Sequence, residues 1–129
     1  MADDYSLSIL AQLGDAVHHL LTIEDKMKFI KQSHELHKSV VNQVNATNQA
    51  KLLELLKPQL SPEELDLVRR ARNCKSIKKV KIKQSIYRRA TALEVLFGFL
   101  YLTDRNRLNY LHEFGQAQTH PDNYPALDT

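Results

Sequence analysis

The sequence predicts an all-α protein. Its 129 residues include only three glycines and four prolines, and Leu, Lys, Glu, Gln and Ala, which favour helices, are frequent. Apolar residues recur at three- and four-residue spacing, the pattern of amphipathic helices. The length fits one domain with its own hydrophobic core. We expect one helical domain over residues 1–117 and a polar tail over residues 118–129.

The first helix is expected from about Ser6 to Leu21, because Leu10, Leu13 and further apolar residues fall on one face. Gly14 lies in the middle of this pattern and costs about 1 kcal/mol relative to Ala in a helix. It should therefore mark a place where another helix or a ligand comes close. A short helix is predicted next, from about residue 24 to residue 30.

Capping residues predict the next boundaries. Ser33 is expected to cap a second helix, and Thr47 a third helix that ends at Pro58. The segment Ser61-Pro62-Glu63-Glu64 is the clearest boundary in the chain. It offers Ser at the N-cap, Pro at the first helical position and Glu three residues after the cap.

A long helix is expected from about residue 86 to residue 102, with Ser85 as its cap and Thr103 beginning a last helix. The 86–102 segment is apolar nearly all round, so it must be central. In so short a chain, covering it fully is expected to require a second subunit, which predicts a homodimer. Residues 74–84 show no stable period and are predicted to form a loop.

Basic residues are concentrated in one segment. Ten of the eighteen Lys and Arg residues lie between Arg69 and Arg89, with no acid among them, whereas the rest of the chain carries eight bases and fifteen acids. An acidic body with one dense basic segment indicates a polyanion docked at that segment. The alternative is a solvated, self-repelling loop.

The chain is expected to be a soluble cytoplasmic protein. Its N-terminus has no basic stretch followed by an apolar run, so no signal peptide is predicted. The longest apolar run, residues 92–102, is interrupted by Glu94 and is far shorter than the roughly 20 residues of a membrane span. A single cysteine, Cys74, rules out an internal disulfide and fits a reducing compartment.

Two carboxylates, Asp15 and Glu94, each lie within a predicted apolar helix. An ionised carboxylate on an apolar face costs several kcal/mol unless it is paired, hydrogen-bonded or bound to a metal. Two carboxylates from different helices, with water, form an oxygen site that suits Mg²⁺ and phosphodiester hydrolysis. The alternative is that each acid pairs with a base such as Arg88 or Arg89, or caps a helix end.

Other candidate ligands form no convincing cluster. His18 and His19 are adjacent, and His34 and His37 are three residues apart. A zinc site normally needs three or four ligands, and no further Cys or His group supplies them. Cys74 lies beside the basic segment, but no His or Asn arrangement marks it as a nucleophile. We interpret all five as structural residues or as polar residues that face the polyanion.

Four blocks carry a resemblance to a known family, and they occur in the family's order: residues 10–17 (LAQLGDAV), 36–38 (LHK), 70–76 (RARNCKS) and 87–102 (YRRATALEVLFGFLYL). The first and last resemble the two acidic segments of the ribonuclease III family. The middle two resemble segments of its short Mini form, which has no separate double-stranded-RNA-binding domain. The resemblance covers about residues 7–103.

The resemblance implies a dimeric, all-α endonuclease bundle that binds double-stranded RNA across both subunits and cuts each strand. Asp15 and Glu94 match the two acids central to that chemistry, as catalytic and metal-binding residues. The implied cofactor is Mg²⁺, with Mn²⁺ as an alternative ion. The usual substrate in this family is a precursor of large-subunit ribosomal RNA in the bacterial cytoplasm.

The sequence departs from the longer enzymes at two acidic positions. Those enzymes carry further acids four residues before the Asp and three before the Glu, where this chain has Ala11 and Thr91. The Mini form resembles this chain in that reduction, so activity is still expected. In the third block, Ala71 stands where a glycine is expected, and Ile77 follows Ser76 where the family usually turns with glycine.

RNA contacts are expected from polar and basic residues of the basic segment and from one lysine near the first acidic helix, because A-form RNA is bound mainly through phosphates and 2′-hydroxyls. These residues are Lys38, Arg72, Asn73, Lys75, Lys78, Lys79 and Lys81. Of Arg88 and Arg89, we expect one to orient Glu94 or Asp15 instead of contacting RNA.

Two other functions fit parts of the sequence. One is a non-catalytic, dimeric double-stranded-RNA-binding protein with the same fold, which the absence of acids at Ala11 and Thr91 would allow. A pure binder, however, gains nothing from two acids near phosphates. The other is a helical DNA-binding regulator, which would need a short helix-turn-helix that the segment from Arg69 to Arg89 lacks.

Overall fold

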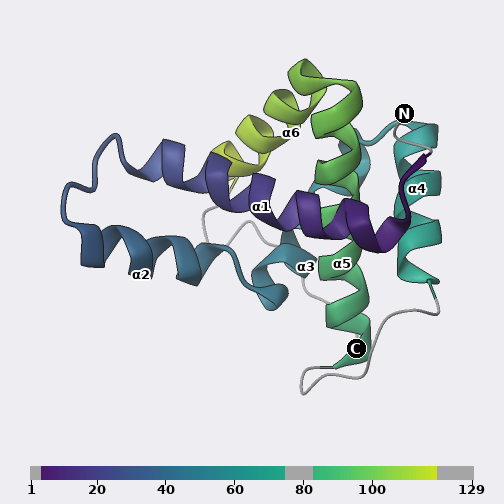
Figure 1. Cartoon of the computed structure of the whole chain (residues 1–129), viewed down its shortest axis with the longest axis horizontal. Helices are drawn as coiled ribbons and strands as arrows, with labels where there is room; N and C mark the ends of the chain where they lie inside the picture. Colours follow the sequence, from purple (N-terminus) through teal and green to yellow (C-terminus); the bar gives the residue numbers. More distant parts are fainter. Residues whose placement is uncertain (1–3, 75–82, 119–129) are drawn as a thin grey trace.

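The computed structural model describes residues 4–74 and 83–118, and within these ranges the chain is helical with no strand (Figure 1). The elements in chain order are α1 (Leu7–Lys26), α2 (Ser33–Gln43), α3 (Ala46–Leu56), the 3₁₀ helix η2 (Lys57–Gln59), α4 (Pro62–Arg72), α5 (Gln84–Thr103) and α6 (Arg105–Gln118). The all-α prediction is confirmed. No helix in this part of the chain combines the length and apolar character needed to cross a bilayer.

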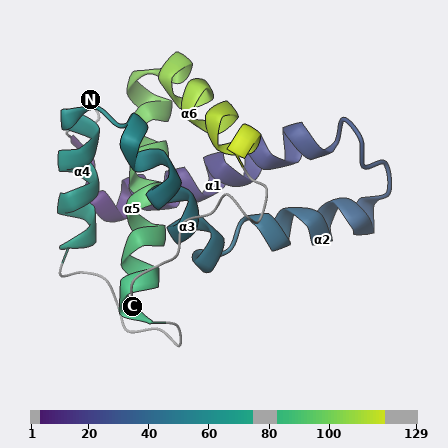
Figure 2. The ribbon, with the colours of Figure 1, turned by 180° about the vertical axis from the view of Figure 1, so that it is seen from behind.

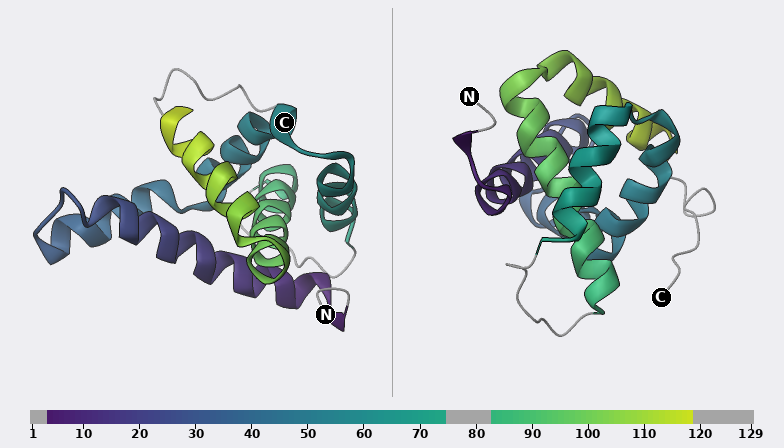
Figure 3. Two further views of the ribbon diagram at one scale, coloured as in Figure 1. Left: turned by 90° about the horizontal axis from the view of Figure 1, so that it is seen from above. Right: turned by 90° about the vertical axis from the view of Figure 1, so that its right-hand side faces the viewer.

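Helix α5 is the centre of the bundle. Helix α1 crosses in front of it in Figure 1, and α3 lies on the opposite side in Figure 2. The left view of Figure 3 looks nearly along α5 and shows α1, α3 and α4 around it. Leu93, Val95, Leu96 and Phe97 are completely buried. The prediction of a central helix is confirmed, but helices of the same chain cover it, so its burial does not require a second subunit.

The first helix is longer than the sequence pattern indicates. Helix α1 continues to Lys26, and the Met27 N–H closes its last turn on the Ile23 carbonyl at 2.9 Å. The separate helix predicted over residues 24–30 is therefore wrong, since its first residues extend α1. Ser33 is the first residue of α2 and not its cap; Gln32 occupies the N-cap position without a side-chain hydrogen bond.

Neighbouring polar residues compete for the capping positions, and the structure selects different ones from those predicted. Asn45 caps α3 instead of Thr47, because its Oδ1 accepts a hydrogen bond from the Asn48 N–H at 3.0 Å. Asp104 caps α6, with its Oδ1 accepting from the Arg107 N–H at 3.0 Å.

Helix α5 begins one residue before Ser85 and ends with Thr103. Lys83 occupies its N-cap position, so the predicted Ser85 cap and the predicted helix start at Thr103 are both wrong. The predicted polar tail begins at residue 118, which is the last residue of α6; the residues after it lie outside the described part of the chain.

The predicted start of α4 is confirmed as a capping box. Ser61 Oγ accepts from the Glu64 N–H at 3.1 Å, and Glu64 Oε1 accepts from the Ser61 N–H at 2.8 Å. The same carboxylate pairs with Arg107 of α6, whose Nη2 lies 2.8 Å from Oε1. Arg107 also donates to the Gln59 carbonyl at 2.6 Å, so one side chain joins the start of α4 to α6.

Candidate active site

Helices α1 and α5 touch backbone to backbone at two glycines. A Cβ atom built on Gly14 would lie 1.6 Å from the carbonyl oxygen of Glu94, and one built on Gly98 would lie 2.1 Å from the carbonyl oxygen of Leu10. No side chain fits at either position. The prediction that Gly14 marks a close approach is confirmed, and this contact is what brings Asp15 next to Glu94.

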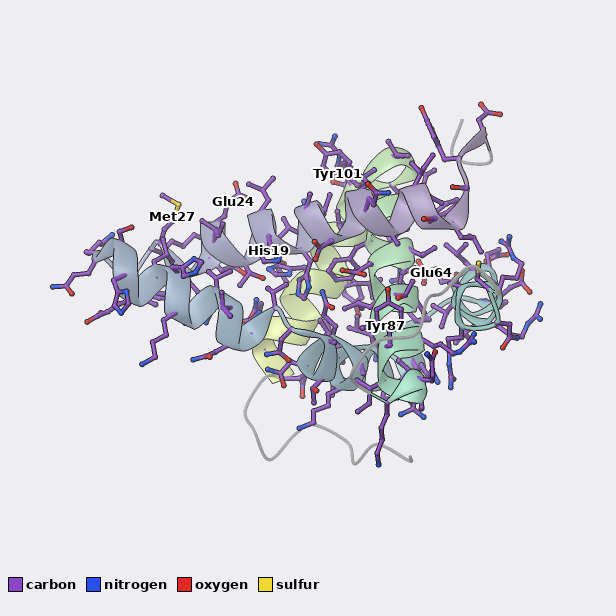
Figure 4. All side chains as sticks on the ribbon, turned by 60° about the horizontal axis from the view of Figure 1, so that its bottom comes forward. His19, Glu24, Met27, Glu64, Tyr87 and Tyr101 are labelled. Atoms are coloured by element: carbon purple, nitrogen blue, oxygen red, sulfur yellow. The ribbon has the colours of Figure 1, made fainter. Side chains whose placement is uncertain are left out.

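Asp15 and Glu94 line one cleft of about 250 Å³. Helix α1 forms one wall of the cleft, α5 forms another, and the end of α4 completes it, with Tyr87 on the first turn of α5 (Figure 4). The lining residues are Leu7, Ser8, Ala11, Gln12, Asp15, Ala71, Cys74, Tyr87, Thr91, Glu94 and Val95. The structure therefore brings together the two acids that lie far apart in the sequence.

The cleft raises the pKa of the Glu94 carboxyl group. Burial raises the pKa of Glu94 to about 8, with further contributions from a hydrogen bond to Asp15 and from its negative charge, while a hydrogen bond from Gln49 acts in the opposite direction. Glu94 is therefore largely protonated at neutral pH and bonded to Asp15. Two oxygen donors forced together in this way suit a divalent cation, whose charge would replace the proton.

If Asp15 and Glu94 hold a metal ion, its other ligands would come from water or RNA. Ala11 and Thr91, which stand where longer enzymes carry acids, line the same cleft and supply no carboxylate. Within the described residues, no group of three His, Cys, Asp or Glu side chains is arranged to hold a metal. Because Mg²⁺ keeps several waters and needs only one or two protein carboxylates, Asp15 and Glu94 fit it.

The arginines at the start of α5 serve other partners. Arg88 Nη1 donates to the carbonyl of Arg72 at 2.8 Å, which fastens α5 to the end of α4. Arg89 is buried and its Nε lies 3.6 Å from an oxygen of Glu54. The groups that shift the pKa of Glu94 are Asp15 and Gln49, so an amide takes the place of the expected arginine.

Two neighbours of the acids were not predicted. His19 Nε2 lies 3.7 Å from Asp15 Oδ1, one turn further along α1 (Figure 4), and the four-residue spacing could have indicated this pair. Gln49 lies on α3, far from both acids in the sequence, and hydrogen-bonds to Glu94. No motif pointed to Gln49, because only the packing of α3 against α5 brings it to the site.

The expected RNA-binding residues lie on different surfaces. Lys38 is exposed on α2, whereas Arg72 and Asn73 end α4 and line a second pocket with Lys57 and Arg69. Arg72 and Asn73 line that pocket rather than the cleft of Asp15. The other four expected residues, Lys75, Lys78, Lys79 and Lys81, lie outside the described part of the chain.

The fold and the paired acids define a ribonuclease III domain, and comparison with known proteins agrees. The family model described as "Ribonuclease III domain" matches residues 8–105. Proteins named Mini-ribonuclease 3 are similar along most of the chain. The protein of Synechococcus sp. is 42% identical over 102 residues, covering 79% of this chain and 74% of the relative. The protein of Gloeobacter violaceus is 40% identical over 116 residues, covering 89% of this chain and 86% of the relative.

A crystal structure of a protein from Fusobacterium nucleatum has the same architecture. It superposes with a TM-score of 0.75 at 29% identity, covering 88% of this chain and 91% of that one. The chain belongs to the ribonuclease III family, and within it to the Mini-ribonuclease 3 group. It is an endoribonuclease, as the resemblance predicted.

Proposed function

We propose that the chain is a Mg²⁺-dependent endoribonuclease that cleaves double-stranded or structured RNA at the cleft of Asp15 and Glu94. The observation that carries the proposal is the placement of these two carboxyl groups in one cleft, in hydrogen-bond contact with each other. A protein without turnover would not need two acids held against mutual repulsion where phosphates bind.

Asp15 and Glu94 would hold the ion. When bound, Mg²⁺ or Mn²⁺ supplies positive charge that lowers the pKa of nearby water and stabilises negative charge on the phosphodiester. The chain's own residues prepare this step. Glu94 would release its proton as the ion binds, and the small side chains of Ala11 and Thr91 leave space in the cleft for water and phosphate oxygens.

RNA binding is proposed for the residues expected from the sequence: Lys38, Arg72, Asn73, Lys75, Lys78, Lys79 and Lys81. Their chemistry suits phosphates and 2′-hydroxyls, which dominate the recognition of A-form RNA. The natural substrate that we propose, a precursor of large-subunit ribosomal RNA in a bacterial cytoplasm, is supported by the resemblance to the Mini form.

A homodimer is supported by α1. Apolar side chains at residues 9, 20, 23 and 27 are between 37% and 52% exposed and fall on one face of the helix, together with Ala16. We call this set, Ile9, Ala16, Leu20, Ile23 and Met27, the α1 stripe. A continuous apolar stripe of this kind on a helix is typical of a protein–protein interface.

The test is cleavage of a labelled RNA duplex with Mg²⁺ by the wild type, Asp15→Asn and Glu94→Gln. We expect both variants to lose activity by more than about 100-fold, because even changes to residues that only support metal ligands cost 10–100-fold in affinity or activity. Both should still bind the duplex in a gel-shift assay.

Glu113→Gln is the control, since Glu113 is an exposed acid on α6 that does not line the cleft. It should cleave like the wild type. Wild-type protein that binds several duplexes but cuts none, with Mg²⁺ or Mn²⁺, would instead establish the alternative function, a non-catalytic double-stranded-RNA-binding protein.

A further inference from the structure

A buried histidine lies behind the active-site acids. His18 of α1 is only 1% exposed, and its ring packs edge-on against Phe97 at 5.3 Å between centroids. Its Nδ1 lies 3.3 Å from Nε2 of Gln49, which is itself 5% exposed on α3. Gln49 also hydrogen-bonds to Glu94 of α5. Three helices thus meet in one buried polar chain.

The contacts determine which way the Gln49 amide faces. Gln49 hydrogen-bonds to Glu94, and because an ionised carboxylate only accepts, the amide donates an N–H to it when Glu94 is ionised. Burial, with the neighbouring His112 and His19, lowers the pKa of His18 to about 3, so the ring is neutral. Nδ1 accepts the second amide N–H in the tautomer that carries the ring hydrogen on Nε2, an atom that is buried with no hydrogen-bond partner among the described residues.

The opposite orientation of the amide would be unfavourable. It would point the Gln49 carbonyl oxygen at the carboxylate of Glu94, and two acceptors would then face each other. The 3.3 Å contact with Nδ1 of His18, whose ring packs against Phe97, is compatible with the orientation that donates to Glu94.

We propose that Gln49 is a positioning residue of the metal site: its amide holds the Glu94 carboxylate in the orientation that binds a divalent cation, and His18 fixes the amide. The proposal rests on the proposed metal-dependent function. It concerns residues that do not touch the ion, and partners of this kind tune affinity by orienting the ligand that does. The two glycine contacts fix the backbone of α5, and Gln49 fixes the side chain that extends from it.

The experiment measures Mn²⁺ binding to the full chain without RNA, from the loss of the free-ion signal in electron paramagnetic resonance. Gln49→Met keeps the length of the side chain and removes both donors. We expect it to weaken Mn²⁺ binding about 10-fold or more. Duplex binding in EDTA should stay unchanged, because that readout does not depend on the orientation of Glu94.

Two variants of His18 test the same proposal if Gln49→Met fails to fold. His18→Leu removes the acceptor and should weaken Mn²⁺ binding severalfold. His18→Asn places an acceptor oxygen near the position of Nδ1 and should bind more tightly than His18→Leu. Thr22→Val is the matched control, because Thr22 is fully buried one turn further along α1 and its hydroxyl has no hydrogen-bond partner within residues 4–74 and 83–118. It should bind like the wild type.

Several outcomes would overturn the proposal. A folded Gln49→Met protein that binds Mn²⁺ like the wild type removes the specific role of the amide. Weakening of Mn²⁺ binding by Thr22→Val to the same extent as by Gln49→Met does so too. Equal binding by His18→Leu and His18→Asn removes the role of His18. If the wild type binds no Mn²⁺ while Asp15 and Glu94 are intact, the metal-dependent function itself fails, which is a different result.

Discussion

Glu94 is the residue whose chemistry depends most on its surroundings. In the unfolded chain its pKa is near 4.5, but in the folded molecule burial and Asp15 raise it to about 8. Between these two values Glu94 binds a proton in the folded molecule that it does not bind in the unfolded chain. His18 acts in the opposite direction, because burial lowers its pKa from 6.5 to about 3.

The free energy of unfolding in EDTA should fall as the pH rises from 6.5 to 8. At pH 6.5 about half of His18 is still protonated in the unfolded chain, and this opposing contribution has nearly vanished at pH 8. Glu94 is ionised in the unfolded chain throughout and stays largely protonated in the folded one until the pH approaches 8. Stability from Glu94 is fully present below pH 4.5 and is lost as the pH approaches 8. Urea denaturation followed by circular dichroism at several pH values measures this slope.

Glu94→Gln is the comparison, since an amide does not titrate. Its unfolding free energy should depend less on pH between 6.5 and 8 than that of the wild type. Equal slopes in the two proteins would show that Glu94 does not titrate in this range. A divalent cation should oppose the loss of wild-type stability at high pH, because it binds the ionised pair.

The sequence could predict that Asp15 and Glu94 come together, because each is an acid within an apolar helical pattern. It could not predict Gln49 or His18 as their neighbours, because polar residues on separate helices meet only through tertiary packing. His18 was interpreted as either a structural residue or a polar residue facing the polyanion, and its burial agrees with the first. Its contact with Gln49 was not predicted. A pattern along one helix carries no information about which residue of another helix faces it.

At the level of helices, the contact between α1 and α5 decides the geometry of the site. Gly→Ala in an exposed helix normally stabilises by about 1 kcal/mol. At Gly14 and Gly98 the added methyl group would overlap backbone atoms of the other helix. We expect Gly14→Ala and Gly98→Ala each to lower the free energy of unfolding by about 2 kcal/mol or more, measured by urea denaturation, and to abolish RNA cleavage.

Gly115→Ala is the matched control. Its Cβ would lie 2.8 Å from Cδ1 of Leu52, which is the end of a flexible side chain and can move. This variant should retain cleavage and change stability far less than the other two. If all three variants behave alike, backbone overlap is not the reason for the glycines on α1 and α5.

Helix centres were easier to predict than helix ends. The apolar spacing correctly indicated a central helix in residues 86–102, and the capping box at Ser61 was correct because its three signals agree. The predicted caps at Ser33, Thr47 and Ser85 and the predicted helix start at Thr103 were wrong. Neighbouring residues occupy the N-cap positions, and which residue does so depends on how the chain enters the bundle.

At the level of the whole molecule, α5 is buried by its own chain, so the α1 stripe is the better argument for a dimer. One chain has a mass of 14.9 kDa. We expect analytical ultracentrifugation of the wild type to give a molar mass of about twice this value, that of a dimer. Leu20→Glu should shift it to the monomer, because the charge would have to be buried in the interface.

Leu65→Glu is the control for this change. Leu65 is 41% exposed on α4, close to the 49% of Leu20, but it lies outside the α1 stripe. It should remain dimeric. Two results would contradict the assignment of the interface to α1. One is a wild-type protein that is monomeric at all accessible concentrations, and the other is a Leu65→Glu protein that is monomeric while the Leu20→Glu protein stays dimeric.

The two glycine contacts have a consequence for turnover. They hold α1 and α5 at two points one helical turn apart, so the helices can neither slide nor roll without backbone atoms colliding. The acids of the cleft are thus in place before any RNA arrives. The entropy of bringing them together is lost once, when the chain folds, and no catalytic cycle has to repeat that loss.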